Sequence, residues 1–352
     1  MTVVRNFGEI LARPALSVVP GAQAVQSRVA ALVVTHNRLD QLRRTVQRLL
    51  AEPVDYLVVV NNASSDGTGA WLAAEADPRL RVVTPARNIG GAGGFEQGLR
   101  YVQDHLDPDW TVLMDDDARP IPGAIQTFRD RVAEFESQGY EAIAGGVFYP
   151  DGRICDMNRP SRNPFWHMGD FFRTLQRGGG RQGYHVPDSA YWTPAGAKAH
   201  PIDATSFVGF FLSRSGLRRG GLPDGGLFIY ADDVIYTLRL TKRGGRIGFL
   251  PEIGFEHDCS TYQARSGDIY RPMWKVYYNY RNSLIAYRLA AGPVLFWPVF
   301  LLAVVKWRRR ARAAGPRRAA YLTMYRLALK DALAGRRSRP HAEIVNRAAE
   351  LS

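Results

Sequence analysis

The sequence predicts an α/β fold in which a mixed, mostly parallel sheet is flanked by helices on both faces. Three observations lead to this prediction. Short apolar runs alternate with amphipathic segments from Val29 onward, the spacing between them is short, and polar motifs follow several of the apolar runs. Runs that are apolar at every position are typical of strands buried on both faces. Beyond residue 270 the pattern is helical to the end of the chain.

The individual elements follow from the period of the apolar positions. Strands are expected at 29–34, 56–60, 80–85 and 110–117, and helices at 40–52, 66–76 and 93–106. Residues 151–200 are rich in Gly, Arg, Trp and Tyr and give no clear element, whereas ordered patterning returns near residue 203. Ligands in such folds bind beyond the carboxyl ends of the strands, so the motifs at those ends are the candidates for function.

Length, net charge and cysteine content limit the possible domain organisation, partners and location of the protein. The 352 residues are expected to form an N-terminal extension at 1–28, an α/β domain at 29–270 and a helical region at 271–352. The formal net charge of +13 favours an anionic partner, which could be a nucleotide diphosphate, nucleic acid or anionic lipid. Two cysteines far apart in sequence, and a first segment without a signal-peptide core, predict a reducing, cytoplasmic location.

One stretch, residues 289–305, resembles a membrane segment. Its 17 residues contain Pro293 and Pro298, and it is followed by Lys306 and six arginines up to residue 318. A spanning helix needs about 20 apolar residues. The pattern therefore favours a helix lying in the interface on anionic headgroups, so that the protein is peripheral on the cytoplasmic face. A buried helix with a solvated basic face is the alternative.

Acidic residues end the strand predicted at 110–117. Asp115 and Asp117 are two apart, so both could reach one cation, and Asp116 lies between them. Oxygen ligands suit hard divalent ions, so Mn²⁺ or Mg²⁺ is the expected cofactor. A solvent-exposed acidic turn before Pro120 is the alternative interpretation, but the five preceding residues are strongly apolar.

Two further groups follow the other strands. The run 87–95 reads RNIGGAGGF, and its glycines could either bring main-chain N–H groups close to an anion or form a tight packing turn. Side chains after the first two strands could hydrogen-bond a base and a ribose, although Asp66 and Asn37 could instead cap helices. These side chains are those of Thr35, His36, Asn37, Arg38, Asn61, Asn62 and Asp66.

The later half of the domain contributes acids and a histidine. Asp232 and Asp233 begin an apolar segment, and burial together with their mutual repulsion could raise one pKa toward neutrality, as a general base requires. An N-cap with a dipole-stabilising acid is the alternative. His257 follows an apolar strand and could be a third metal ligand, or a structural histidine.

Taken together, the motifs resemble those of the family 2 glycosyltransferases of GT-A fold, and among these the bacterial galactofuranosyltransferases. The strings that carry the resemblance are VVTHNR, RNIGGAGGF, MDDDA, FIYADDVIYTLR, GFEHD and YYNYRN, within roughly residues 29–290. The resemblance implies an inverting, metal-dependent transfer of a sugar from a nucleotide donor. Related rhamnosyltransferases share much of the pattern, and Asn61 stands where the family often has Asp.

The resemblance also implies roles for individual residues. Asp115, Asp117 and His257 would hold the metal, and Asp233 would be the base, with Asp232 as the nearby alternative. The donor would lie against the 35–38 and 61–66 side chains and against Arg87, Asn88, Gly91, Gly94, Phe95 and Asp116. We assign Phe210, Tyr230 and Trp192 to the acceptor side.

The expected function is therefore the transfer of galactofuranose from UDP-galactofuranose to a glycan or a polyprenyl-linked glycan in cell-wall polysaccharide synthesis. A rhamnosyltransferase that uses dTDP-rhamnose is the first alternative. A non-catalytic basic protein that binds nucleotides or nucleic acid is the second, and it is disfavoured because the arginines cluster after residue 306 without interleaved stacking aromatics. No nucleic acid partner is expected.

Overall fold

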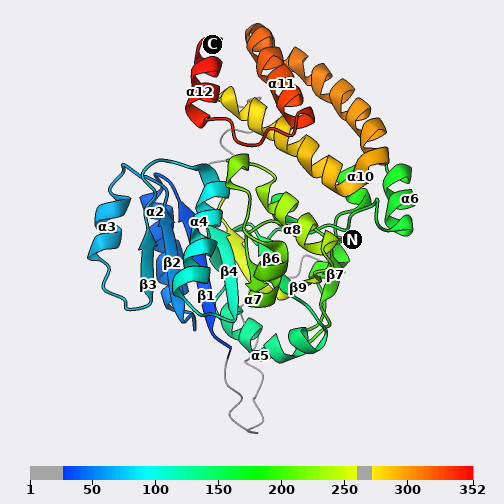
Figure 1. Ribbon diagram of the computed structural model, residues 1–352. Coiled ribbons are helices and arrows are strands. Elements are labelled where there is room, and N and C mark those ends of the chain that lie inside the picture. Colours follow the sequence, from blue (N-terminus) through cyan, green and yellow to red (C-terminus); the bar gives the residue numbers. More distant parts are fainter. Residues whose placement is uncertain (1–26, 260–271, 352) are drawn as a thin grey trace.

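The computed structural model describes residues 27–259 and 272–351 of the chain (Figure 1). It contains a large sheet with helices on both faces and, against one end of this layer structure, a bundle formed by the last part of the chain. The predicted fold class is therefore confirmed. Most of the extension predicted at 1–28, and the boundary predicted at 270, lie outside the described residues.

The sheet has nine strands in the order β3-β2-β1-β4-β8-β6-β9-β5, and β7 pairs with β9. Strands β1 to β4 are mutually parallel neighbours, as are β6 and β9, whereas β5, β7 and β8 run antiparallel to their partners. The bounds are β1 Val29–Thr35, β2 Tyr56–Asn61, β3 Leu80–Val83, β4 Trp110–Asp115, β5 Ala118–Pro120, β6 Ala142–Phe148, β7 His200–Ile202, β8 Phe210–Ser213 and β9 Ile247–His257.

The helices cover the sheet because each has an apolar face that matches one side of the strands. The inward-facing residues of α2 and α5 pack with Val29, Ala31 and Val33 on one face of β1, whereas those of α4 and α8 pack with Leu32 and Val34 on the other. The bounds are α2 Leu39–Leu50, α3 Thr68–Ala74, α4 Gly90–His105, α5 Ala124–Ser137, α7 Arg214–Gly220 and α8 Asp232–Lys242.

The order of strands reverses direction beside β1. The chain passes from β1 to β2 and β3 on one side and then returns to β4 on the other, so the connections diverge at the carboxyl ends of β1 and β4. The register pairs Val34 with Asp115, so Thr35 and the acidic motif lie next to each other at this edge. The fold therefore gathers the motifs that the sequence separates.

The acidic motif is a turn rather than a straight strand end. The strand predicted at 110–117 ends at Asp115, and Asp116 and Asp117 turn the chain into β5. The Thr45 hydroxyl on α2 donates to the carbonyl of Asp116 at 2.7 Å and holds this turn. Asp115 and Asp117 therefore converge through the turn and not through strand alternation.

The irregular region 151–200 contains only short elements. These are the 3-10 turns η1 Asp156–Asn158, η2 Arg181–Gly183 and η3 Asp188–Tyr191, together with the helix α6 Met168–Gln176. Helix α6 presents Met168, Phe172 and Leu175 to the outside, each more than half exposed. Figure 1 shows α6 beside the bend of the long helix α10.

The last part of the chain is helical, as predicted. It comprises α10 Trp274–Arg310, the 3-10 segment η5 Ala311–Arg317, α11 Arg318–Leu333 and α12 His341–Ala349. Their core is rich in tyrosine, and it includes Tyr277, Tyr280 and Tyr321. Helix α10 bends at Gly292, whose φ of 71° interrupts the helix just before Pro293. Among the described helices, only the helical stretch Trp274–Leu333 is long and apolar enough to span a membrane. One 18-residue window in it has a mean hydropathy of 1.9, and 17% of that window is buried.

Candidate active site

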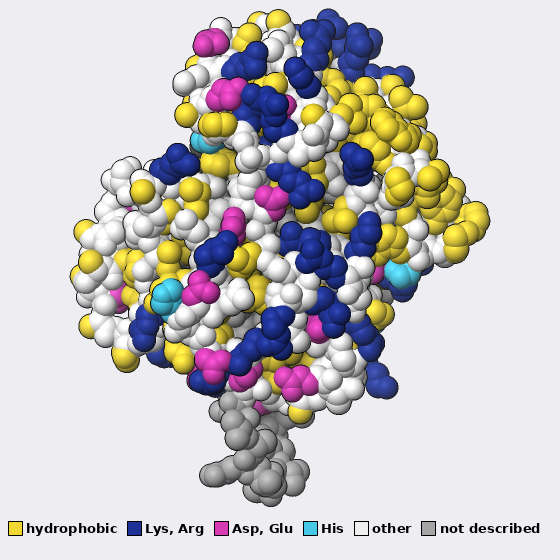
Figure 2. Space-filling view, viewed as in Figure 1, with side chains coloured by type: hydrophobic (Ala, Val, Ile, Leu, Met, Phe, Trp, Pro, Cys, Tyr) yellow, Lys and Arg dark blue, Asp and Glu magenta, His cyan; other side chains and the backbone are white. Residues whose placement is uncertain are grey.

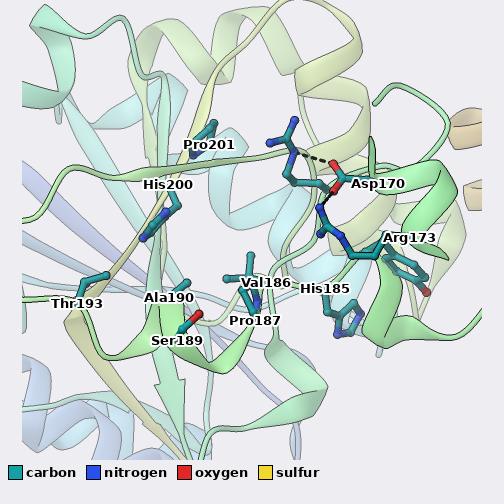
Figure 3. A pocket seen from close by; sticks show the side chains of 12 residues that line it. Asp170, Arg173, His185, Val186, Pro187, Ser189, Ala190, Thr193, His200 and Pro201 are labelled. Atoms are coloured by element: carbon teal, nitrogen blue, oxygen red, sulfur yellow. Dashed lines mark ion pairs between the residues drawn. The ribbon is translucent and has the colours of Figure 1, made fainter. Parts of the chain in front are cut away.

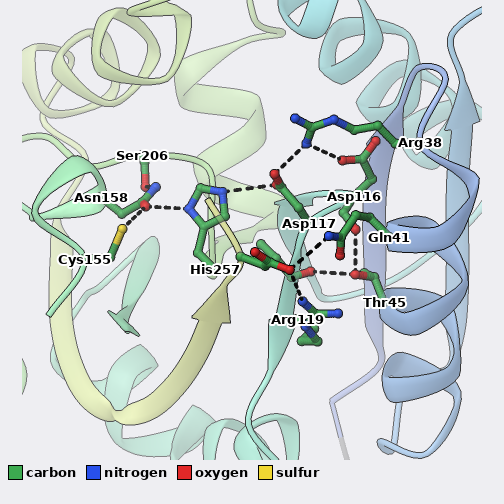
Figure 4. Close-up of polar contacts among 12 residues, drawn as sticks. Arg38, Gln41, Thr45, Asp116, Asp117, Arg119, Cys155, Asn158, Ser206 and His257 are labelled. Carbon is green, nitrogen blue, oxygen red and sulfur yellow. Dashed lines mark hydrogen bonds and ion pairs between the residues drawn. The ribbon is translucent and has the colours of Figure 1, made fainter. Parts of the chain in front are cut away.

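Two carboxylates and a histidine meet at the carboxyl edge of the sheet, and Figure 4 shows Asp117 and His257 of this group with Asp116 beside them. Asp115, Asp117 and His257 each offer a ligand atom, and these atoms lie within 4.8 Å of one another. Strand β5 pairs with the end of β9, with Ala118 opposite His257, and this pairing brings the histidine to the acidic turn. The His257 Nε2 atom lies 3.1 Å from Asp117 Oδ1.

The second ring nitrogen of His257 contacts Asn158, a residue that the sequence did not indicate. Its Nδ1 atom lies 2.7 Å from Asn158 Oδ1, which also accepts a hydrogen bond from the Cys155 thiol at 3.0 Å. Asn158 in turn donates to the Ser206 hydroxyl at 2.9 Å. Groups that fix the orientation of a metal-ligating imidazole act in this way. No motif identifies Asn158, because it lies in the irregular region.

Two polar side chains, one at the end of β1 and one at the start of α2, contact the acidic turn. The Thr35 hydroxyl donates to Asp116 Oδ2 at 2.7 Å. The Arg38 guanidinium pairs with Asp116 at 3.2 Å and also with Asp117, and one third of its side chain is exposed. The arginine therefore lies at the rim, between the acids and solvent.

Burial and like charge control the ionisation of the acids. Burial and the neighbouring charge of Asp117 raise the pKa of Asp115 to about 7, and the same two causes raise that of Asp116 to about 6. Burial opposes ionisation of Asp117 too, but the hydrogen bond and charge of His257, together with Arg38, hold its pKa below the usual value. The pKa of His257, which burial alone would lower, is raised to about 10 chiefly by Asp117.

The donor set fits a divalent cation. Carboxylate oxygens and one imidazole are ligands that suit Mn²⁺ or Mg²⁺. A bound cation would also compensate the repulsion that raises the pKa of Asp115. The chemistry of these residues is therefore compatible with the cofactor expected from the sequence.

The second pair of acids opens helix α8. Ala231, in the left-handed conformation, precedes Asp232 and Asp233 in the first turn. Burial raises the pKa of Asp233 to about 6, against hydrogen bonds from main-chain N–H groups that lower it. Burial and the charges of Asp233 and Asp115 raise the pKa of Asp232. The second pair therefore interacts electrostatically with Asp115 of the acidic motif.

Most amides expected at the nucleotide are engaged in holding loops together. Asn62 Nδ2 donates to Asn88 Oδ1 at 3.1 Å and to the Gly90 carbonyl at 3.0 Å. Asn61 Oδ1 accepts from the Ser64 N–H at 3.1 Å. His36 Nδ1 lies 2.9 Å from the Asn62 carbonyl. These contacts join the loops after β1 and β2 to the start of α4.

Three further predicted donor contacts differ in their surroundings. Asn37 is in the left-handed region, with a φ of 53°, and its Oδ1 accepts from the Ser65 N–H at 2.7 Å. Asp66 accepts from the main-chain N–H groups of Leu39 and Thr68, the first residues of α2 and α3, whereas Gly67 is the N-cap of α3. Arg87 is exposed at the rim.

The glycine-rich motif is mainly a packing device, which corrects part of the prediction. Helix α4 begins at Gly90, so these glycines lie in the helix and not in a loop before it. A Cβ on Gly94 would lie 2.4 Å from Val34 Cγ1, and Phe95 is 3% exposed, 4.8 Å from the ring of Phe207. The sugar contacts predicted for Gly94 and Phe95 are wrong, because α4 lies too close to β1. Gly91 has open space around it.

The three residues predicted on the acceptor side differ in how far they are exposed. Phe210 is 0% exposed in β8 and packs against Tyr236 in the core, so the predicted acceptor contact is wrong. All residues of β8 are buried, as is typical of a central strand that is covered on both faces, so Phe210 belongs to the core of the sheet. Tyr230 is half-buried directly before α8, and Trp192 is 39% exposed beside Phe148. Both are partly exposed, and their contacts with the acceptor stay predictions.

A separate pocket of about 270 Å³ lies in the 162–201 region (Figure 3). Arg162 and Arg173 line it, and each pairs with the buried Asp170. None of the residues around the acidic turn lines this pocket, so it is distinct from the candidate active site.

Comparison with known proteins assigns the class. Residues 30–191 match the family described as glycosyl transferase family 2. The chain is 29% identical over 239 residues to galactofuranosyltransferase GlfT1 of Mycobacterium tuberculosis, and the match covers 66% of this chain and 71% of that protein. GlfT1 of Mycolicibacterium smegmatis is 26% identical over the same length, with coverage of 66% and 72%.

Other similarities are more distant. The undecaprenyl-phosphate mannosyltransferase of Micrococcus luteus is 34% identical over 94 residues, which are 26% of this chain and 37% of that protein. The solved structure of the mannosyltransferase PcManGT from Pyrobaculum calidifontis, in complex with GDP-Man and Mn²⁺, aligns with a TM-score of 0.47 at 18% identity, with coverage of 98% of this chain and 85% of that one.

The protein is an enzyme, a glycosyltransferase of GT-A fold. Its residues 30–191 match glycosyl transferase family 2, and the chain is similar to the galactofuranosyltransferases GlfT1. The family therefore favours the enzyme over the alternative of a basic protein without catalytic activity.

We predict that two glycines in the first turns of α4, Gly91 and Gly94, respond differently to alanine. Gly94→Ala forces a methyl group against Val34 and is expected to lower the free energy of unfolding by about 1–3 kcal/mol. Gly91→Ala places its methyl group in open space and should stabilise α4 by up to about 1 kcal/mol. Urea denaturation of both variants measures the difference. Equal stability of the two would contradict the packing role of Gly94.

We also predict that Mn²⁺ stabilises the protein through the acidic cluster. At about a hundred times its Kd, the ion should add about 2.7 kcal/mol to the free energy of unfolding. Asp117→Ala should abolish this gain, whereas Asp66→Asn should retain it, because Asp66 contacts main-chain groups away from the cluster. Thermal denaturation with and without Mn²⁺ is the measurement. A full metal-dependent shift in Asp117→Ala would show that the ion binds elsewhere.

Proposed function

We propose that the protein is an inverting, metal-dependent galactofuranosyltransferase that uses UDP-galactofuranose. The observation that carries this proposal is the cluster of possible metal ligands at the carboxyl edge of the sheet, together with a second acidic pair that interacts electrostatically with it. One group, Asp115, Asp117 and His257, has the composition of a metal site. The other, Asp232 and Asp233, is half-buried and has no basic partner among its described hydrogen bonds and ion pairs. The sequence similarity to GlfT1 favours galactofuranose.

The donor would bind along the edge formed by β1, β2 and the acidic turn. Arg38 and Arg87 would contact the anionic groups of the nucleotide, and Thr35, Asn37 and Asn61 its base and ribose. When bound, the divalent ion would neutralise charge that develops on the diphosphate leaving group. Arg38 would exchange part of its pairing with Asp116 and Asp117 for the donor, because it already lies at the rim.

Asp233 would act as the general base. The acceptor hydroxyl oxygen forms a bond to the anomeric carbon while the bond from that carbon to the diphosphate oxygen breaks. The hydroxyl proton passes to the Asp233 carboxylate. One displacement inverts the configuration, and no covalent intermediate with the protein is needed. A pKa of about 6 leaves Asp233 largely ionised at neutral pH, yet basic enough to accept a proton.

The best-supported alternative donor is dTDP-rhamnose. Asn61 offers an amide where related enzymes often carry a carboxylate, and its Oδ1 accepts from Ser64. The amide nitrogen could contact either pyrimidine. A comparison of transfer rates with UDP-galactofuranose and dTDP-rhamnose decides between them, and a preference for dTDP-rhamnose would overturn the galactofuranose assignment.

We predict that the base determines the pH dependence of turnover. The ionised form of Asp233 is the active one, so kcat/KM should rise with pH through about 6 and level off above it. Asp233→Asn should lose about 10²- to 10⁴-fold in kcat and retain donor binding. Transfer assays and titration calorimetry are the measurements. If Asp232→Asn shows this loss instead, Asp232 is the base.

We further propose that the protein is peripheral on the cytoplasmic face of a membrane, with 271–352 as the membrane-proximal region beside a 29–270 transferase domain. The second half of α10 exposes apolar side chains that a soluble protein normally buries. They are Val294, Leu295, Trp297, Leu301, Leu302 and Val305, exposed by 43% to 78%. Exposed apolar patches of this kind favour a lipid or protein partner.

The proposed membrane surface includes a second element that the sequence did not indicate. Figure 2 shows apolar side chains continuing from the arm formed by α10 toward the position of α6 in Figure 1. The exposed Met168, Phe172 and Leu175 belong to α6. The Asn163 amide donates to the Ala290 carbonyl at 3.0 Å and ties the chain before α6 to the bend of α10.

The positive charge beside this apolar surface favours a lipid bilayer over an apolar protein as its partner. Lys306, Arg308, Arg309, Arg310, Arg312 and Arg318 are exposed next to the apolar half of α10. A basic cluster at the end of an apolar helix suits the anionic headgroups of a bilayer. An acceptor carried on a polyprenyl lipid would then be presented near the enzyme, which favours a lipid-linked glycan.

We predict that single charges in this surface weaken vesicle binding. Leu302→Glu and Phe172→Glu should each reduce partition onto vesicles containing anionic lipid by at least about tenfold, because each removes a buried apolar contact worth about 1.5–3 kcal/mol. Val82→Glu, at an exposed apolar residue on β3, is the matched control. Co-sedimentation measures the partition. Unchanged binding of Leu302→Glu would exclude this face as the contact.

A further inference from the structure

The segment that leads into Asp232 and Asp233 has an unusual backbone. Phe228, Tyr230 and Ala231 have φ values of 65°, 72° and 57°, and none of them is glycine. Left-handed backbone is unfavourable for bulky residues and costs on the order of 1–3 kcal/mol for each. Such a segment persists only where its surroundings hold it. Residues 226–231, named here the base loop, are therefore expected to have strong supports.

The strongest support is a pair of adjacent side chains on α10. Asn282 Nδ2 donates to the carbonyls of Leu227, Ile229 and Tyr230 at 3.0, 2.8 and 2.8 Å. Arg281 Nη2 donates to the carbonyls of Gly226 and Leu227, both at 2.9 Å. The two side chains thus bind successive carbonyls of the base loop.

The two residues also fix each other. Arg281 Nε donates to Asn282 Oδ1 at 2.9 Å, so the Asn282 amide nitrogen must face the base loop. Both side chains are 0% exposed. Buried polar groups that exchange hydrogen bonds in this way are rigid, and the loss of one donor leaves carbonyls unpaired at a cost of about 1–3 kcal/mol.

The opposite side of the base loop rests on the glycine-rich start of α4. The Ala92 N–H donates to the Phe228 carbonyl at 3.1 Å. A Cβ on Gly90 would lie 2.1 Å from that carbonyl oxygen, so glycine is required there. The Phe228 ring stacks on His341 of α12 at 3.8 Å between centroids. The base loop is therefore held between the donor-side helix and the C-terminal bundle.

We propose that Arg281 and Asn282 are positioning residues that hold the base loop so that Asp233 faces the acceptor hydroxyl. This proposal rests on the proposed role of Asp233. Neither residue contacts the acidic cluster through a described hydrogen bond, and both act through the main chain of residues 226–230. In this proposal, the YYNYRN motif at 277–282 supports catalysis by holding the base loop and not by binding a ligand.

A double-mutant cycle on the full-length protein tests the proposal. Asn282→Ala should lower kcat by about tenfold to a hundredfold, the cost of a displaced catalytic group, with the Kd of UDP-galactofuranose in Mn²⁺ unchanged. Because Asn282 acts through Asp233, the double variant Asn282→Ala/Asp233→Asn should be no slower than Asp233→Asn alone. The rise of kcat with pH near 6 should also weaken in Asn282→Ala.

Three further variants keep the test sharp. Tyr280→Phe removes a buried hydroxyl on the same helix that hydrogen-bonds Tyr321, so it should retain full kcat. Asn282→Ser retains one donor and guards against loss of folding in the alanine variant. Arg281→Lys retains the charge but not the paired donors, and it should lower kcat in the same way. Circular dichroism verifies that each variant is folded.

The outcomes separate the two proposals. Full turnover of Asp233→Asn would overturn the proposed base. Full turnover of folded Asn282→Ala beside an impaired Asp233→Asn would overturn the positioning role alone. Multiplicative losses in the double variant, or an equal loss in Tyr280→Phe, would mean that Asn282 supports stability in general and not Asp233.

Discussion

The repulsion among buried carboxylates at one edge of the sheet is the constraint on which the rest of the site depends. Asp115 ends β4, Asp116 and Asp117 follow it in the turn, and the latter two are buried. Such a group is stable only beside positive charge or hydrogen-bond donors. His257 reaches it from the end of β9, and Arg38 and Thr35 reach it from the end of β1. The strand order thus supplies the compensating groups, and a cation would complete them.

The long helix α10 connects two proposed functions of the molecule. Its first half carries Arg281 and Asn282 against the base loop, and its second half carries the exposed apolar surface. The bend at Gly292 divides the two halves. A catalytic segment and a lipid-facing segment on one helix would place the reacting hydroxyl of a lipid-linked acceptor at a fixed height above the membrane.

Glycine in this enzyme serves packing more than ligand contact. The RNIGGAGGF motif has the composition of an anion-binding loop, yet Gly94 lies against Val34 and Gly90 lies against the Phe228 carbonyl. The same residues make the close approach of α4 to β1 and to the base loop possible. The motif therefore contributes to the site indirectly, because it lets α4 lie close to both β1 and the base loop.

The sequence by itself determined the alternation of strands and helices, the helical C-terminal region and the composition of both acidic groups. These features are local, because each depends on apolar period or on neighbouring residues. Only the tertiary structure decided that Asp115 and Asp117 converge through a turn, that Asn158 orients His257, and that Phe210 and Phe95 are core residues. Those facts depend on strand pairing and layer spacing between distant segments. For the same reason the base loop and its support by Asn282 could not be predicted, since contacts more than 50 residues apart leave no periodic signal.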